Sequence, residues 1–234
     1  MKINSLLPKA FVAFGLAAFA VSAQAGPVPM NDAVAPADDL GMTISVGYDT
    51  DYIFRGVDLG DNLIWGEVDK SFALTDQLSL DLGVWYASLA AQDYDELDLI
   101  SGLSYDLGQV KVGVGYIWYY FPRGGNPDNT GEIVASLSSS VGIVDLGLNY
   151  YYDHKLFNGH YIEATASTSI ALTDRISLEP GVSIAYDIDY NTTTSGFATV
   201  GVGLALPIAL TDNATLTPYV SANLPIDVLE KAGD

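Results

Sequence analysis

Carboxylates recur on one face of the segments that this sequence predicts to be β-strands. Successive side chains of a strand point to opposite faces, so residues of one parity share a face. A ring of carboxylates around water attracts cations and repels anions. The sequence therefore predicts a lumen whose charged lining is Asp49, Asp51, Glu67, Asp81, Asp98, Lys111, Glu163 and Glu179, with Arg55 as a charge at its mouth.

A second candidate chemistry is hydrolysis. His154 follows Asp153, and Asp49 and Asp51 share the polar face of one strand, so these residues resemble the His–Asp and paired-carboxylate arrangement of omptin proteases. Adjacent residues point apart in an extended chain, however, and no serine-centred or zincin-type histidine motif is present. We therefore predict no catalytic residue and no enzyme, and keep an omptin-like hydrolase as an alternative.

Metal binding is the third possibility. The acids of the predicted loops offer hard oxygen ligands of the kind that Ca²⁺ takes, but none follows a metal-loop spacing; they are Asp58, Asp61, Asp93, Asp95, Asp128, Asp187 and Asp189. The chain has no cysteine, so it has neither disulfides nor thiolate sites. No metal and no cofactor are predicted.

Five segments alternate apolar and polar residues and end in aromatic residues before a polar loop. They are Met42–Phe54, Leu78–Tyr86, Val110–Tyr120, Val144–Tyr152 and Ile176–Tyr186. The segments between them run back to tight turns at Thr75-Asp76-Gln77, Gly108-Gln109, Val141-Gly142, Thr173-Asp174-Arg175 and Thr211-Asp212-Asn213. This pattern predicts an all-β fold, an antiparallel transmembrane β-barrel of about 10–12 strands with short periplasmic turns and longer extracellular loops.

The apolar face of these strands carries almost no charge, whereas the opposite face is rich in Gly, Ser, Thr and acids. We expect the apolar face to meet lipid; a soluble, lipocalin-like barrel would place the same face in its packed interior. The strand-end aromatics are then expected to form an outer girdle at head-group depth: Tyr52, Phe54, Tyr86, Trp118, Tyr120, Tyr150, Tyr152 and Tyr186. Inward aromatics such as Trp65, Trp85, Tyr119 and Tyr151 are the candidates for lining a passage.

Ten strands are predicted directly and an eleventh at Ala214–Leu224. The tail Pro225–Asp234 is a poor strand, but an even-numbered barrel would need it as the twelfth.

Residues 1–25 have the features of a signal peptide: Lys2 and Lys9, the apolar run Phe11–Val21, and Ala23-Gln24-Ala25 as the cleavage site. We expect residues 26–40 to be a flexible lead-in and residues 41–234 to form the barrel. The 29 acidic and 9 basic residues give a net charge of −20, and two of those bases lie in the leader. Such a charge excludes nucleic acid as a partner, because phosphate binding needs Lys and Arg.

The first strand and the segment ending in Pro122 carry a family resemblance. The chain resembles the TorF-family porins, a group of small outer-membrane barrel proteins. The matching residues are Tyr48, Tyr52-Ile53-Phe54-Arg55-Gly56, Glu96-Leu97-Asp98-Leu99, Gly115–Pro122 and Glu132. The resemblance implies a cell outer membrane barrel. The chain departs from this pattern at its C-terminus, since such barrels usually end in an aromatic residue and this chain ends in Ala-Gly-Asp.

Together these observations predict a porin-like channel in the outer membrane for passive diffusion of ions or small polar solutes, with a preference for cations. Its partners would be the lipid bilayer and those solutes. A closed barrel with a structural or adhesive role is the alternative within the same fold, and the sequence does not specify the oligomeric state.

Overall fold

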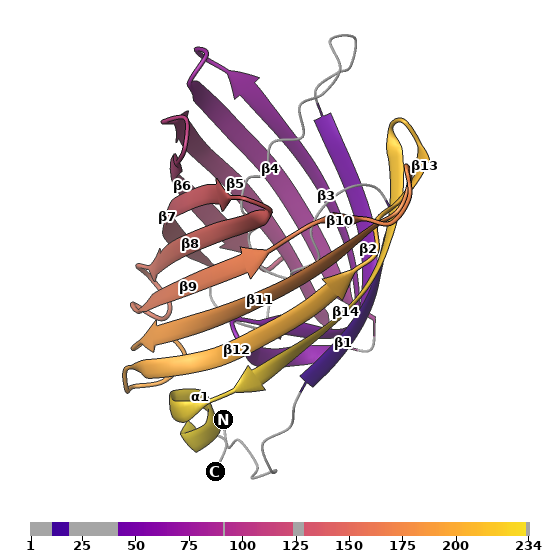
Figure 1. The fold of residues 1–234 in the computed structure, drawn as a ribbon. Helices are drawn as coiled ribbons and strands as arrows, with labels where there is room; N and C mark the ends of the chain where they lie inside the picture. Colours follow the sequence, from indigo (N-terminus) through magenta and orange to yellow (C-terminus); the bar gives the residue numbers. More distant parts are fainter. Residues whose placement is uncertain (1–10, 19–41, 91, 124–128, 233–234) are drawn as a thin grey trace.

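The computed structural model describes residues 11–18, 42–90, 92–123 and 129–232, and these form one closed antiparallel sheet (Figure 1). The strands follow one another in chain order around the barrel, except that the short β10 and β13 pair only with β11 and β14, and β1 pairs with both β2 and β14 to close the ring. The strands are β1 Phe11–Ala18, β2 Met42–Phe54, β3 Val57–Ala73, β4 Leu78–Leu89, β5 Tyr94–Asp106, β6 Lys111–Tyr120, β7 Thr130–Val141, β8 Val144–Asp153, β9 His160–Ser167, β10 Ile170–Ala171, β11 Ser177–Ile188, β12 Gly196–Ala205, β13 Ile208–Thr211 and β14 Ala214–Pro225.

The two faces of the sheet confirm the predicted orientation. Leu82, Val114 and Val202 are 42%, 60% and 45% exposed on the outside, with many other large apolar side chains around them. Ser183 and Asn149, of the opposite parity, are buried. An outer surface this apolar is unsuited to water and matches the lipid-facing band of a membrane barrel. Among the described residues, no helix is both long and apolar enough to cross a bilayer.

The two ends of the barrel differ, as predicted. The short turn between β13 and β14 lies at the upper right in Figure 1, whereas the longer connections after β8 and β11 lie at the left and lower left. One predicted loop is wrong. The polar residues after Phe54 form no loop, because Arg55 and Gly56 alone turn the chain and β3 starts at Val57. Their φ angles of 48° and 80° are those of the two-residue hairpin turns that suit twisted strands.

The C-terminal tail is not the twelfth strand. Residues Asp227–Ala232 form the short helix α1, whose Val228 is 5% exposed. With β9 and β10 counted as one crossing, and β12 and β13 as another, the described strands make twelve crossings. The additional crossing is β1, which lies within the segment predicted as a leader, whereas the predicted lead-in at 26–40 lies outside the described residues.

Candidate channel constriction

The β2–β3 hairpin bends into the barrel instead of standing at its rim. Its pairing shifts register between Tyr52 and Ile53, and Gly60 and Asn62 on β3 have positive φ angles of 145° and 61°. The purple tip of this hairpin runs across the lower part of the barrel in Figure 1. The hairpin tip therefore lies in the lumen, at the end that carries the long connections.

The bend corrects two girdle predictions. Tyr52 is 2% exposed, and its hydroxyl donates a hydrogen bond of 2.9 Å to Glu96 inside the barrel. The Phe54 ring packs edge-on against Tyr119, an inward residue that is 3% exposed, with 6.0 Å between the ring centroids. Strict alternation places Tyr52 and Phe54 outside, but the irregular hairpin turns both of them into the lumen.

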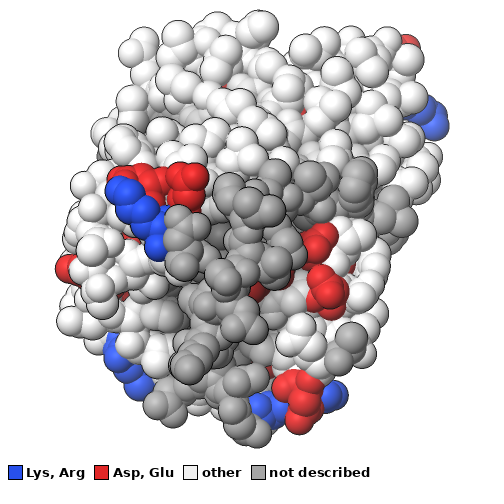
Figure 2. Space-filling model, turned by 90° about the horizontal axis from the view of Figure 1, so that it is seen from below, with Lys and Arg blue, Asp and Glu red and all other residues white. Residues whose placement is uncertain are grey.

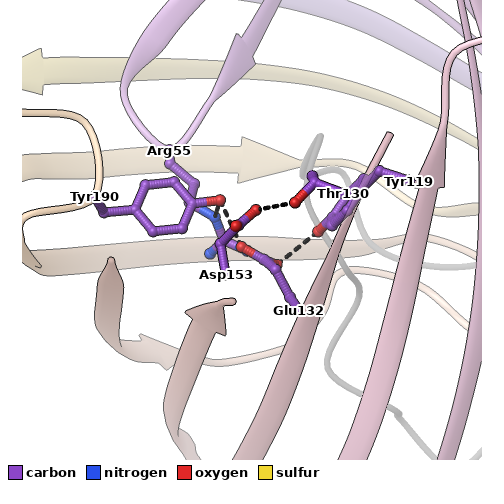
Figure 3. A network of polar contacts seen from close by, with 6 residues as sticks. All are labelled: Arg55, Tyr119, Thr130, Glu132, Asp153 and Tyr190. Atoms are coloured by element: carbon purple, nitrogen blue, oxygen red, sulfur yellow. Dashed lines mark hydrogen bonds and ion pairs between the residues drawn. The ribbon is translucent and has the colours of Figure 1, made fainter. Parts of the chain in front are cut away.

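Arg55, at the hairpin tip, forms a buried ion pair with Glu132 of β7. The distance between Arg55 Nη2 and Glu132 Oε2 is 2.5 Å, and the two side chains are 5% and 0% exposed (Figure 3). The guanidinium also lies over the Tyr151 ring, 3.8 Å from its centroid. Arg55 is therefore a buried cation held by a carboxylate and an aromatic face, and not the solvated mouth charge that the sequence predicts.

Two tyrosines complete the bonding of Glu132. The Tyr119 hydroxyl donates to Oε2 at 2.7 Å, and the Tyr190 hydroxyl donates to Oε1 at 2.5 Å. Arg55 Nε in turn donates to the Tyr190 oxygen at 3.2 Å. Burial raises the pKa of the Tyr190 phenol well above its ordinary value, against the opposing effect of the Arg55 charge. Tyr190 therefore stays protonated and keeps its hydrogen bond to Glu132 across the physiological pH range.

The network spans the lumen. Arg55 connects β2 and β3, while Glu132, Tyr151 and Tyr161 lie on β7, β8 and β9 and Tyr190 lies in the connection after β11. Around the ring, β4–β6 separate these two groups on one side, and β1, β14, β12 and β11 separate them on the other. A bond between them therefore crosses the interior. We call this set, Arg55, Glu132, Tyr119, Tyr151 and Tyr190, the Arg55 network.

Asp153 and His154, considered for hydrolysis, have separate structural contacts. Asp153 is fully buried and accepts hydrogen bonds from Thr130 Oγ1 at 2.6 Å and from the backbone amides of Lys155, Leu156 and Phe157 at 2.8–3.1 Å. The exposed His154 ring stacks on Tyr116 and lies 3.0 Å from its hydroxyl. The described contacts thus use Asp153 to hold the connection after β8 and join neither residue to Asp49 or Asp51.

The predicted lumen carboxylates lie at two levels of burial. Asp49, Glu67 and Asp98 are less than a tenth exposed, and Asp49 accepts hydrogen bonds from Trp65 at 3.2 Å and from Tyr219. Asp81 accepts from Ser104 at 3.0 Å, and Glu179 accepts from Ser169 at 3.0 Å. Asp51, Asp81, Lys111, Glu163 and Glu179 are partly exposed. These positions have the parity of inward-facing residues. Residues of the same parity on each strand are generally less exposed than the outward-facing residues between them.

The other predicted girdle residues are partly or largely exposed on the outer side. Tyr86 and Tyr120 are 44% and 41% exposed. Tyr150 and Tyr152 stack on His160, and Lys155 lies over the Trp118 ring. Tyr186 packs edge-on against Phe197, which is 48% exposed.

Comparison with known proteins places the chain in a family. A family model described as "Bacterial protein of unknown function (Gcw_chp)" matches residues 33–223, which is most of the chain. The chain belongs to the Gcw_chp family. The comparisons do not confirm the TorF-family assignment, and a search of curated proteins gives no match to this Gcw_chp protein.

The Gcw_chp chain has low sequence identity and low TM-scores to the solved membrane barrels that it matches. The NanC porin has a TM-score of 0.48 and 11% identity, covering 94% of this chain and 100% of that one. The anion-selective porin from Comamonas acidovorans has a TM-score of 0.33 and 17% identity, covering 79% of this chain and 56% of that one. The translocator domain of the autotransporter NalP from Neisseria meningitidis has a TM-score of 0.37 and 10% identity, with coverages of 93% and 87%. Because these scores are low, the barrel assignment depends on the strand pairing and the apolar outer face.

Sequence reasoning missed Glu132 and Tyr190 as site residues of this Gcw_chp protein. Glu132 lies near the start of a strand, where an acidic side chain is expected to be exposed to water. Tyr190 lies in a connection between strands. Arg55 was an available signal, because it is a basic residue next to a mainly acidic lining and a buried cation needs a carboxylate partner.

Proposed function

We propose that this chain is an outer-membrane, porin-like channel for passive diffusion of ions or small polar solutes, with a preference for cations. The observation that carries the proposal is the combination of an apolar outer face and an acidic inner face on one closed sheet. No chemical step is needed for this function, and no cofactor enters it.

The charge balance of the interior favours cations. Glu132 neutralises Arg55, so the predicted mouth charge adds no net positive potential. Asp49, Glu67, Asp81 and Glu163 remain on the inner face. Figure 2 shows acidic and basic side chains close together on the lower surface of the molecule, so the preference for cations depends on the inner face. A low-dielectric wall strengthens the field of such groups and raises the local cation concentration.

A closed barrel is the second candidate, favoured by the packing at the loop end. The Arg55 network crosses the lumen beside two clusters of buried residues, one that includes Tyr161 and Ala198 and another that includes Leu63 and Leu89. If these groups leave no continuous path, the molecule serves as a structural or adhesive element of the membrane.

Planar-bilayer recording of the refolded protein tests both candidates. We expect discrete single-channel conductance and a reversal potential displaced toward that of K⁺ across a KCl gradient. The Asp81→Asn, Glu163→Gln double variant should move the reversal potential toward zero, whereas Asp212→Asn, in an exposed turn, should not. Anion selectivity would contradict the cation preference, and a silent bilayer containing folded protein would favour the closed barrel.

Export follows from the same proposal. Cleavage after Ala25 would release the chain to the outer membrane and would remove β1. Because β1 closes the ring and is antiparallel to both β2 and β14, closure of the mature barrel would require those two strands to pair directly in parallel.

A further inference from the structure

A second acidic group lies in the lumen beside the Arg55 network. Glu96 and Asp98 are two residues apart on β5, so both point inward, and they are 3% and 8% exposed. Their carboxyl groups lie within hydrogen-bonding reach of each other. We call these two residues the Glu96–Asp98 pair.

The hydrogen bonds of this pair are incomplete. Glu96 Oε2 accepts from the Tyr52 hydroxyl at 2.9 Å and from the Tyr94 hydroxyl at 2.6 Å. Asp98 Oδ1 is buried and, among the described residues, receives no hydrogen bond. A carboxylate oxygen that has lost its water and gained no donor is energetically costly, so this atom calls for a partner.

The arginines that form ion pairs in the described part of the chain bind other carboxylates. The guanidinium of Arg55 is bound to Glu132, and Arg123 pairs with Asp93 and Asp95. No ion pair among the described residues includes Glu96 or Asp98. Two buried carboxylates in contact cannot both ionise without compensation. A proton shared between them would relieve the repulsion but would still leave Asp98 Oδ1 without a donor.

We propose that the Glu96–Asp98 pair binds a small hard cation, with Asp98 Oδ1 as a ligand. A cation would compensate both carboxylates and fill the vacant bonding position of that oxygen, and carboxylate and hydroxyl oxygens are the ligands that Ca²⁺ and similar cations take. The described residues contain no cluster of three or more metal-ligating side chains. The pair therefore supplies only part of a coordination shell, and binding is reversible.

The position of the pair connects the site with transport. Asp98 is opposite Trp85 of β4 and Tyr119 of β6, and Tyr119 is also a donor to Glu132. The cation therefore sits against the Arg55 network. That the cation arrives along the lumen is the part of this inference that rests on the proposed function.

Terbium luminescence tests the site in detergent-solubilised protein. Tb³⁺ is a hard cation whose emission is sensitised by nearby aromatic rings, and Trp85 lies opposite Asp98. We expect saturable, Ca²⁺-competed emission on tryptophan excitation, and weaker Tb³⁺ affinity by about tenfold or more in Asp98→Asn and in Glu96→Gln. Trp85→Phe should lower the emission without changing the affinity.

Asp81→Asn is the matched control, because Asp81 faces the same lumen from β4 and already accepts a hydrogen bond from Ser104. Its Tb³⁺ affinity should fall far less than that of Asp98→Asn, because Asp81 contributes to the field of the lumen but is not a ligand. The site is overturned if Asp98→Asn and Asp81→Asn bind Tb³⁺ alike, or if Trp85→Phe leaves the emission unchanged.

The binding assay and the bilayer recording separate this inference from the proposed function. If Tb³⁺ binding requires Asp98 but the protein shows no conductance, the cation site is supported and the channel proposal is wrong. If the protein conducts cations selectively but Asp98→Asn leaves Tb³⁺ binding unchanged, the channel proposal is supported and the cation site is wrong.

Discussion

At the scale of single residues, the stability of the fold depends on the buried guanidinium of Arg55. Arg55 has charge compensation from Glu132, ring faces from Tyr151 and Tyr161, and a hydrogen bond to Tyr190. Breaking a buried pair is much more costly than breaking an exposed one, because the remaining charge stays buried without compensation. Arg55 therefore contributes to stability mainly by preventing Glu132 from being an isolated buried carboxylate.

This argument predicts that Arg55→Ala lowers the free energy of unfolding by about 3–5 kcal/mol. Urea titration of the detergent-folded protein, followed by tryptophan fluorescence, would measure the loss. Arg123→Ala is the control: its side chain is 52% exposed and pairs with Asp93 and Asp95, so the expected loss is much smaller than that of Arg55→Ala. Equal losses in the two variants would contradict a structural role for the Arg55 network.

At the scale of elements, the β2–β3 hairpin decides the shape of the lumen. A Cβ atom added at Gly56 would collide with Thr199 Cγ2 of β12 and would come within 2.9 Å of Leu229 in α1. The turn therefore packs against the opposite wall and the C-terminal helix with no spare room. Gly56 also has a φ of 80°, which an L-residue adopts only with strain.

Comparison of two glycine substitutions separates packing from backbone strain. Gly108 has a φ of 92°, but a Cβ atom there would meet nothing within 4 Å. We expect Gly108→Ala to cost about 1–2 kcal/mol for the left-handed backbone. Gly56→Ala should cost about 1–3 kcal/mol more, from overpacking. Unfolding midpoints of both variants would check this difference, and equal costs would mean that the hairpin tip is not docked.

At the scale of the whole molecule, the outer surface separates a membrane barrel from a soluble one. Val84 is in the middle of β4, where it is 44% exposed and is flanked across the sheet by the exposed Val68 and Leu99. Val141 is 63% exposed at the turn end of β7. Arginine at mid-depth on a lipid face costs about 2–4 kcal/mol, and near the interface about 0–1 kcal/mol.

We therefore predict that Val84→Arg destabilises the protein in lipid vesicles by about 2–4 kcal/mol and that Val141→Arg has little effect. Reversible unfolding in vesicles of defined thickness is the measurement. If the outer face instead met water, arginine would be tolerated at both positions, and an unchanged stability for Val84→Arg would overturn the membrane assignment.

Residues whose environment is set by their own strand could be predicted from the sequence. The alternation along β4 and β12 places Leu82 and Val202 outside without knowledge of any partner strand, because a strand's side-chain period is two. The tight turns at Thr75-Asp76-Gln77 and Thr211-Asp212-Asn213 follow in the same way from local turn chemistry.

The errors lie where the chain leaves regular geometry. Tyr52 and Phe54 have the parity of outward residues, yet the register shift and the bend of the β2–β3 hairpin turn both inward. Likewise, the residues after Phe54 have loop-like composition, although two of them complete the turn and the rest belong to β3.

The sequence by itself determined that this chain alternates, that its apolar stripe carries almost no charge and that acids collect on the other side, because these properties depend on neighbouring residues alone. Only the tertiary structure decided that Arg55 meets Glu132, 77 positions away, and Tyr190, 135 positions away. Those contacts exist because ring closure brings opposite walls within reach of one bent hairpin, and residue spacing along a chain contains no measure of distance across a lumen.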